Sequence, residues 1–109
     1  MAKKELDLRK IEGFDWDQGN IDKNWMKHKV YYKEAEQIFF NEPFDIRLDE
    51  KHSQVEDRFV ILGVTDKGRK ISAIFTLRNN KIRVISARTQ DRKERRIYEK
   101  IKTDTKVQK

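Results

Sequence analysis

The densest set of residues that could do chemistry lies between Arg83 and Tyr98. Arginine presents a planar fork that can bind two oxygens of one phosphate. Several arginines around one phosphate could stabilise the extra charge of a pentacovalent transition state. The same residues could equally be solvated charges on a short basic helix. The candidates in this stretch are Arg83, Ser86, Arg88, Arg92, Lys93, Arg95, Arg96 and Tyr98.

RNA cleavage is a reaction that such a set of residues could catalyse. RNA carries its own nucleophile, the ribose 2′-hydroxyl. An enzyme need only align this group, help to remove its proton and protonate the leaving 5′ oxygen.

One candidate for proton transfer is His28, which ends a predicted helix between Lys27 and Lys29. The dipole at a helix C-terminus favours the charged imidazole. The flanking lysines favour the neutral form. A plain helix-end residue without a catalytic role fits this spacing as well.

Glu56 and Arg58 flank the start of a predicted strand. Glu56 could be a general base and Arg58 a phosphate ligand, although a simple pair of strand-end charges is an equal alternative. His52 lies in a polar loop and is interpreted as a solvated residue.

Other kinds of site find little support in the composition. The chain has no cysteine, which excludes disulfides, zinc–thiolate sites and thiol catalysis. It has two histidines and four ungrouped glycines, so neither a metal cage nor a phosphate-binding glycine loop is expected. The sequence therefore predicts metal-free chemistry and no cofactor.

The net charge of +7 is unevenly distributed along the 109 residues. Residues 78–109 hold 12 basic and 4 acidic residues, a net charge of +8, whereas residues 1–77 hold 14 and 15, a net charge of −1. Such asymmetry favours a polyanionic partner such as nucleic acid. The 11 aromatic residues argue against disorder, although 41% of the chain is charged.

Two helices are predicted in the first half. Asp17 can cap a helix from about Gln18 to His28, because its carboxylate can accept from the free N–H groups of the first turn. Ile21 and Trp25 would form the apolar face of this helix, and Trp16 and Trp25 are expected in the core. A second helix is predicted from about Lys33 to Phe40, before Pro43.

Four strands and a last helix are predicted after this point. Asn79-Asn80 suits a two-residue type I′ hairpin turn, and Asp66-Lys67-Gly68 is also a predicted turn. Asp91 and Glu94 form a possible capping box for a helix over about Arg92–Lys102. The expected strands are Phe44–Leu48, Arg58–Val64, Lys70–Leu77 and Lys81–Ala87.

The predicted fold class is α+β. A small antiparallel sheet of about four strands carries two N-terminal helices and one C-terminal helix. With the helices on one side, the other face of the sheet stays open and is the natural place for a site. Strict alternation places Ser86 and Arg88 on one face and Arg83 on the other, unless a bulge or the strand end brings them together.

One domain is expected over residues 13–102, with a flexible N-terminal lead over 1–12 and a polar C-terminal tail over 103–109. The charged start does not fit a signal peptide. No apolar run approaches the roughly 18 residues of a membrane span, so a cytoplasmic protein is expected.

Several motifs of the chain, taken together with their order and spacing, resemble those of the BrnT toxin family, whose fold resembles that of RelE-type ribonucleases. The most specific motif is Arg83-x-Ile85-Ser86-Ala87-Arg88 followed by Arg95-Arg96-x-Tyr98-Glu99. The resemblance covers nearly everything from Gly13 to Tyr98. The other matching motifs are Phe14-Asp15-Trp16-Asp17, Asn24, Lys27-His28, Ala35-x-x-Ile38-Phe39 with Pro43, Glu56-Asp57-Arg58-Phe59 and Leu62-Gly63.

The resemblance implies a type II toxin, a metal-independent endoribonuclease that inhibits translation. It also implies a BrnA-like antitoxin with a ribbon-helix-helix domain, which would carry the contact of the complex with promoter DNA. Arg92, Arg95 and Arg96 are expected to bind RNA. Arginines would hold the phosphate, His28 or Glu56 would move protons, and Tyr98 would orient the substrate. The site residues that the resemblance suggests are Lys27, His28, Glu56, Arg58, Arg83, Ser86, Arg88 and Tyr98.

The chain departs from the family pattern at Lys29, where members usually have glycine. Glycine would permit a left-handed helix end, which lysine adopts only at a cost. Two alternatives to an active ribonuclease remain: a non-catalytic nucleic-acid-binding module, and a decayed toxin that acts only as the partner of an antitoxin.

Overall fold

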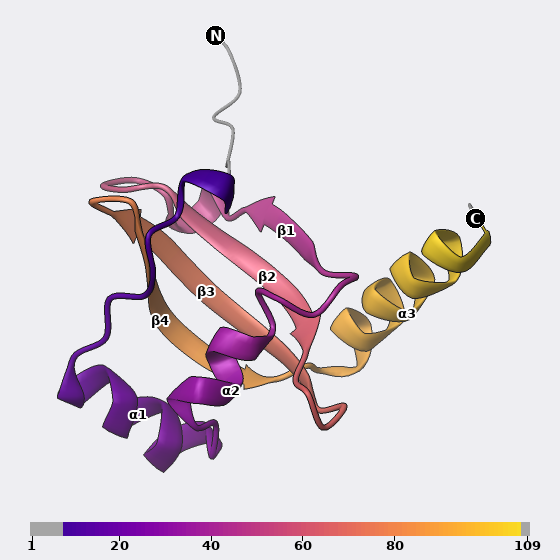
Figure 1. Cartoon of the computed structure of the whole chain (residues 1–109), viewed down its shortest axis with the longest axis horizontal. Coiled ribbons are helices and arrows are strands. Elements are labelled where there is room, and N and C mark those ends of the chain that lie inside the picture. The colour runs from indigo at the N-terminus through magenta and orange to yellow at the C-terminus, as the bar shows by residue number, and fades with distance from the viewer. Residues whose placement is uncertain (1–7, 108–109) are drawn as a thin grey trace, which may run out of the picture.

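The computed structural model describes residues 8–107 and contains a four-stranded antiparallel sheet in the order β1-β2-β3-β4. This confirms the predicted α+β class with a four-stranded sheet and three α-helices. Figure 1 shows α1 and α2 together at one side of the sheet and α3 extending away from it. The elements are η1 (Leu8–Lys10), α1 (Gln18–His28), α2 (Tyr32–Gln37), β1 (Asp45–Leu48), η2 (Glu50–His52), β2 (Arg58–Val64), β3 (Lys70–Arg78), β4 (Lys81–Thr89) and α3 (Arg92–Val107).

The turns of the sheet follow their sequence signals. Asn79 and Asn80 have φ angles of 53° and 63°, which the predicted type I′ turn between β3 and β4 requires. At the β2–β3 turn, the Gly68 N–H donates to the Thr65 carbonyl over 2.9 Å, and Gly68 has a φ angle of 88°. Both predicted turns are confirmed.

One face of the sheet packs against α2 and the segments beside it. Phe75 is fully buried and contacts Phe39 and Phe59 through its ring. At Gly63 on β2, an added Cβ would lie 2.9 Å from both the Cβ and the carbonyl oxygen of Ile38. Glycine therefore allows the end of α2 to approach the strand closely.

The free edge of β4 is covered by polar side chains of α1. The Asn24 side-chain oxygen accepts from the Ala87 N–H over 3.1 Å, the Lys23 ammonium donates to the Ile85 carbonyl over 2.8 Å, and the Asn20 amide donates to the Val84 carbonyl. These bonds satisfy backbone groups that an edge strand would otherwise leave unpaired.

This arrangement overturns the expectation that Trp25 belongs to the core. The Trp25 side chain is 47% exposed, and the Lys29 ammonium lies 5.2 Å from its ring centre. Asn24 is the buried residue of α1 because this face must supply hydrogen bonds to β4. Trp16 is partly buried against the core, as expected, and its indole N–H donates to Glu36 over 2.9 Å.

A bulge in β4 brings the predicted site residues of this strand onto one face. The register shifts beside Ile74, and Ile85 is the extra residue of β4. Paired residues of antiparallel strands point to the same face, and the partners of three β4 residues are alternate residues of β3. The pairs are Arg83 with Thr76, Ser86 with Ile74, and Arg88 with Ser72. We call this side of the sheet the open face.

The start of α3 lies on the open face, opposite to α1 and α2. The Ser72 hydroxyl donates to the Glu94 carboxylate over 3.1 Å, and Ile97 lines a surface pocket with Val60 and Leu62. The expectation that all helices cover one side is therefore wrong for α3. This helix also continues beyond its predicted end at Lys102, to Val107. Of the predicted lead and tail, residues 1–7 and 108–109 lie outside the described residues.

Candidate functional site

Three arginines meet at one end of the open face. Arg58 at the start of β2 and Arg83 near the start of β4 both pair with Thr76 of β3, and Arg78 follows two residues later on β3. They line a pocket with a volume of about 340 Å³. Its charged lining also includes Lys23, Asp17 and Glu56, so the pocket has four basic and two acidic side chains. We call it the arginine pocket.

The acidic residues of the arginine pocket lie between its cations. Glu56 is 3.6 Å from the Arg58 guanidinium and 3.4 Å from that of Arg78. Asp17 accepts from Arg83 over 2.6 Å, and Asp15 is 3.7 Å from Arg83. Each arginine of the pocket therefore has an acidic neighbour in the free chain, and four cations against two acids still leave the lining positively charged.

The Asp17 carboxylate makes two interactions: one of its oxygens caps α1, and the other accepts from Arg83. Asp17 accepts from the Asn20 N–H over 2.7 Å. The hydrogen bond from Arg83, followed by that from the Asn20 backbone, lowers the pKa of the Asp17 carboxyl. The same hydrogen bond raises the pKa of the Arg83 guanidinium. Both shifts favour the charged pair at neutral pH.

Arg58 is the least bonded of these arginines. Within residues 8–107, its guanidinium has Glu56 as an ion-pair partner, and its buried Nε has no hydrogen-bond partner. Buried donors in native proteins are nearly always paired. The Arg58 side chain is nevertheless 37% exposed, so a phosphate could reach its guanidinium.

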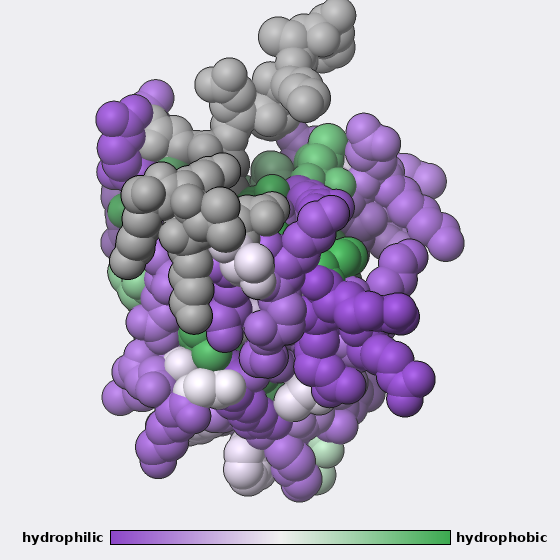
Figure 2. Space-filling view, turned by 90° about the vertical axis from the view of Figure 1, so that its right-hand side faces the viewer, coloured by the Kyte–Doolittle hydropathy of each residue, from purple (hydrophilic) through white to green (hydrophobic). Residues whose placement is uncertain are grey.

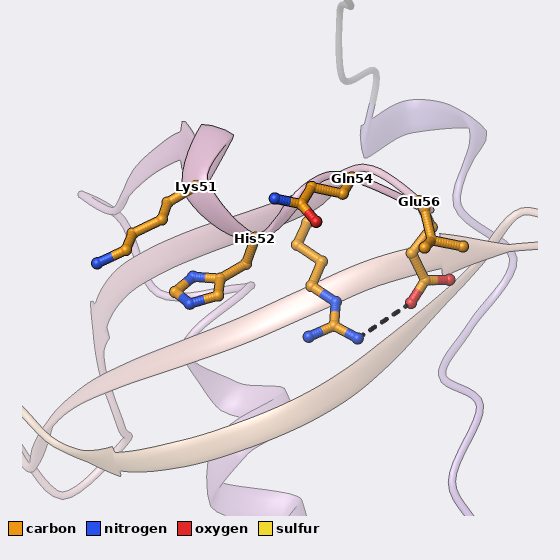
Figure 3. A pocket seen from close by; sticks show the side chains of 6 residues that line it. Lys51, His52, Gln54 and Glu56 are labelled. Atoms are coloured by element: carbon orange, nitrogen blue, oxygen red, sulfur yellow. Dashed lines mark ion pairs between the residues drawn. The ribbon is translucent and has the colours of Figure 1, made fainter.

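A second pocket lies beside the first and shares Glu56 and Arg58 with it. It has a volume of about 270 Å³, and the loop between β1 and β2 supplies the rest of its lining. We call it the histidine pocket, because His52 lies in this loop (Figure 3). The remaining lining residues are Lys51, Gln54 and Val55.

A comparison with protein-family models identifies the kind of protein to which this cluster belongs. Residues 16–94 match the model of the ribonuclease toxin BrnT of type II toxin–antitoxin systems. The chain belongs to the BrnT family. The family implies an RNA target and a cognate antitoxin. A search of curated proteins gave no match.

The BrnT match spans every residue of the arginine pocket and ends at Glu94, before Arg95, Arg96 and Tyr98. Among the described residues, no group of three or more histidine, aspartate or glutamate side chains could hold a metal ion together. No helix within residues 8–107 is long and apolar enough to cross a membrane.

The structure places Arg88, a predicted site residue of the BrnT motif, at the opposite end of the open face from Arg83. Their β3 partners, Ser72 and Thr76, are four residues apart, which corresponds to roughly 13 Å along a strand. Arg88 donates to both oxygens of Glu94, over 2.8 and 3.0 Å. This bidentate bond raises the pKa of the Arg88 guanidinium.

Glu94 has further bonds that hold the start of α3. It accepts from the Asp91 N–H over 2.9 Å, while Asp91 accepts from the Glu94 N–H over 2.8 Å. These reciprocal bonds confirm the predicted capping box. Arg88 is thereby tied to the helix cap.

Tyr98 is a buried residue of α3 and lies outside both pockets. It is fully shielded from solvent, and its hydroxyl donates to the Pro43 carbonyl over 2.8 Å. Burial raises the pKa of the Tyr98 hydroxyl. Ser86 lies between the two ends of the open face, opposite Ile74.

Lys27 and His28 lie at the end of α1, beside the turn that precedes β3. The Arg69 guanidinium donates to the Lys29 carbonyl over 2.8 Å and to the His28 carbonyl over 3.4 Å. Arg69 precedes Lys70, which pairs with Val64 at the far end of β2. Val64 is six residues from Arg58 along this strand, which corresponds to roughly 20 Å. The structure therefore does not bring His28 to the arginine pocket.

Lys29 adopts a left-handed backbone conformation, which glycine would adopt without cost. Its φ and ψ angles are 55° and 38°, a left-handed helix end, and its N–H donates to carbonyls of the last turn of α1. The αL conformation costs roughly 1–2 kcal/mol for a non-glycine residue.

The predicted RNA-binding residues Arg92, Arg95 and Arg96 are exposed on α3. Figure 2 views the molecule from the side towards which α3 extends, and this side is largely hydrophilic. Arg95 has one long bond, 3.5 Å, to the Gln90 carbonyl. These side chains are accessible to a polyanion.

Arg78 and Lys23 were not predicted as site residues from the sequence, and Asp17 was predicted only as a helix cap. Arg78 could have been found from the hairpin, since a two-residue turn at Asn79-Asn80 pairs it with Lys81 and places it on the same face as Arg83. No comparable signal exists for Lys23, because its place depends on how α1 packs beside β4.

Proposed function

We propose that the chain is a metal-independent endoribonuclease that acts in the cytoplasm, cuts RNA by attack of the 2′-hydroxyl and thereby inhibits translation. The observation that carries this proposal is the arginine pocket, in which Glu56 pairs with both Arg58 and Arg78, and Arg83 lies in the same lining. The ribonuclease activity of the BrnT family supports the same reading.

In this proposal, Arg58 and Arg83 hold the scissile phosphate. Their side chains lie on one face because both residues pair with Thr76. Guanidinium forks can donate to two phosphate oxygens at once. As the 2′ oxygen attacks, negative charge grows on these oxygens, and cations held in place beforehand stabilise the transition state more than the ground state.

Glu56 is the proposed general base. Its carboxylate lies 3.6 Å from the guanidinium of Arg58, which would hold the phosphate, so it would lie close to the ribose that precedes the cut. It would accept the 2′-hydroxyl proton as the O2′–phosphorus bond forms. The products would be a 2′,3′-cyclic phosphate and a free 5′-hydroxyl.

We further propose that the antitoxin is a BrnA-like protein with a ribbon-helix-helix domain and that promoter DNA is contacted through it. The resemblance to the BrnT family supports this proposal. The exposed arginines of α3 would bind RNA that extends beyond the cut.

The test is cleavage of a mixed-sequence RNA in excess EDTA, with and without ribosomes, by the wild type, Glu56→Gln and Glu50→Gln. Glu50 is exposed in the same loop and serves as the matched control. Cyclic-phosphate ends from the wild type and Glu50→Gln, with little cleavage by Glu56→Gln, would support the proposal. RNA binding without cleavage under both conditions would indicate the non-catalytic binding module. If the wild type neither binds nor cuts RNA, the chain is a decayed toxin.

A further inference from the structure

The loop between β1 and β2 holds His52 in a defined position next to the arginine pocket. The Asp49 N–H donates to the Arg58 carbonyl over 2.7 Å, which joins the two ends of the loop. The Ser53 hydroxyl donates to the Asp49 carbonyl over 2.6 Å and accepts from the Arg58 N–H over 2.9 Å. His52 is thus fixed relative to the backbone of Arg58, a proposed phosphate ligand.

Asp49 orients the His52 ring. The Nδ1 atom of His52 lies 2.9 Å from Oδ2 of Asp49. An ionised carboxylate can only accept, so Nδ1 carries the proton of this hydrogen bond. Nε2 is then the nitrogen that exchanges protons with a substrate or with water. The Asp49 side chain is 15% exposed and that of His52 is 57% exposed. The carboxylate is therefore mostly shielded from solvent, while the ring stays accessible.

His52 and Glu56 both line the histidine pocket but come from different parts of the loop. Figure 3 shows the His52 ring and the Glu56 carboxylate at opposite sides of this pocket. Arg58 lines both pockets, so a phosphate bound to Arg58 would have Glu56 and His52 within the same site. In-line displacement requires a base near the attacking oxygen and an acid near the leaving oxygen, on opposite sides of the phosphorus.

We propose that His52, oriented by Asp49, is the general acid that protonates the leaving 5′ oxygen, an inference that rests on the proposed ribonuclease function. The O2′–phosphorus bond forms while Glu56 takes the 2′-hydroxyl proton. The phosphorus–O5′ bond breaks while His52 Nε2 gives its proton to O5′. Water then returns a proton to His52 and removes the one on Glu56. Asp49 is a positioning residue.

Neither of the two lysines that line these pockets has the same arrangement. Lys51 is exposed on the same loop, and Lys23 donates to the Ile85 carbonyl. Among these three residues of the described chain, His52 combines an accessible ring with a mostly shielded partner, Asp49, that sets its direction. This reading differs from the sequence-based interpretation of His52 as a solvated loop residue.

The test compares two RNAs of one sequence, whose cut site is first mapped with the wild type. The second RNA has sulfur in place of the bridging 5′ oxygen at that site. A thiolate leaves without protonation near neutral pH, since thiols have a pKa of about 8.5. The variants are His52→Gln, Asp49→Asn and, as a control, His28→Gln, each checked for folding by circular dichroism.

His52→Gln is expected to cut the normal RNA about 10²- to 10⁴-fold more slowly than the wild type. It should cut the sulfur-containing RNA at close to the wild-type rate. Asp49→Asn should show the same pattern with a smaller loss, and His28→Gln should match the wild type on both substrates.

Equal losses of His52→Gln on both RNAs, or no loss on either, would overturn the role of His52 while leaving the ribonuclease function intact. A wild type that cuts neither RNA, with or without ribosomes, would instead refute the proposed function itself.

Discussion

The two ends of the open face both hold an arginine bound to a carboxylate, but the two pairs differ in what else they bind. At one end, Arg88 donates twice to Glu94, which is 19% exposed and also belongs to the helix cap. At the other end, Arg83 binds Asp17, which is 55% exposed. A phosphate can displace an exposed carboxylate from Arg83 more easily than it can remove Glu94 from Arg88.

This difference shows that arginine density alone does not identify a phosphate site. The partner of each guanidinium decides whether it is available. Arg58 has a single ion-pair partner at 3.6 Å among residues 8–107, whereas Arg88 holds three hydrogen bonds, two of them to one carboxylate. We therefore assign binding to the first end and anchoring of α3 to the second.

Among changes at the two ends of the open face, the largest loss of cleavage rate is expected from Arg58→Ala, because Arg58 lines both pockets. Loss of one preorganised charged donor should slow RNA cleavage by about 10²- to 10³-fold. The measurement is the initial cleavage rate at low RNA concentration, with circular dichroism as a check on folding. Arg47→Ala is the control, since Arg47 is exposed on β1 and bonds to its neighbour Asp45. Equal rates for the two variants would remove Arg58 from the site.

Arg88→Ala should change stability instead of chemistry. It leaves Glu94 partly buried without its bidentate partner, which should lower the free energy of unfolding by about 1–3 kcal/mol. Urea unfolding measures this change, and Arg92→Ala, at an exposed position in the first turn of α3, is the control. A variant as stable as the wild type would contradict the anchoring role.

Asp17→Asn tests whether Asp17 competes with RNA for Arg83. Asparagine caps a helix about as well as aspartate, so α1 should persist while the negative charge is lost. We expect a lower Kd for an RNA whose 2′-hydroxyls are methylated to prevent cleavage. Asp22→Asn, on the exposed side of α1, is the control. Unchanged or weaker binding by Asp17→Asn would speak against displacement of this carboxylate.

The smallest effect that we expect is a change in stability caused by substitution of Lys29, at the end of α1 that is distant from the arginine pocket. Lys29→Gly should be more stable than Lys29→Ala by about 1 kcal/mol, because glycine adopts the αL conformation without strain. Both variants lose the contact of Lys29 with Trp25, so their difference in Tm isolates the backbone term. Neither variant should alter RNA cleavage, since this end of α1 lies away from the arginine pocket.

Much of the fold could be predicted because its signals are local. The bounds of α1 and β2, the cap at Asp17 and the turn at Asn79-Asn80 all depend on neighbouring residues, and each was found. The exposure of Trp25 was not predictable in this way. It follows from the need of the β4 edge for hydrogen bonds, which only the packed structure reveals.

The site was predictable in part. Glu56, Arg58 and Arg83 do lie together, and the bulge at Ile85 was one of two ways foreseen to place Arg83 with Ser86 and Arg88 on one face. Arg88 is close in sequence to Arg83, but this closeness was misleading, because the Arg88 guanidinium donates to the carboxylate of Glu94, six residues later. The pairing of His52 with Asp49 depends on a loop conformation that no local pattern indicated.

The most direct test of this account is the cleavage rate per folded molecule of Arg83→Ala and Arg88→Ala, measured side by side in EDTA on one RNA. Folded fractions would be taken from unfolding curves under the same conditions. We expect Arg88→Ala to cut at nearly the wild-type rate and Arg83→Ala to lose most of its activity. An inactive but folded Arg88→Ala, together with an active Arg83→Ala, would place the phosphate at the other end of the open face and contradict the account.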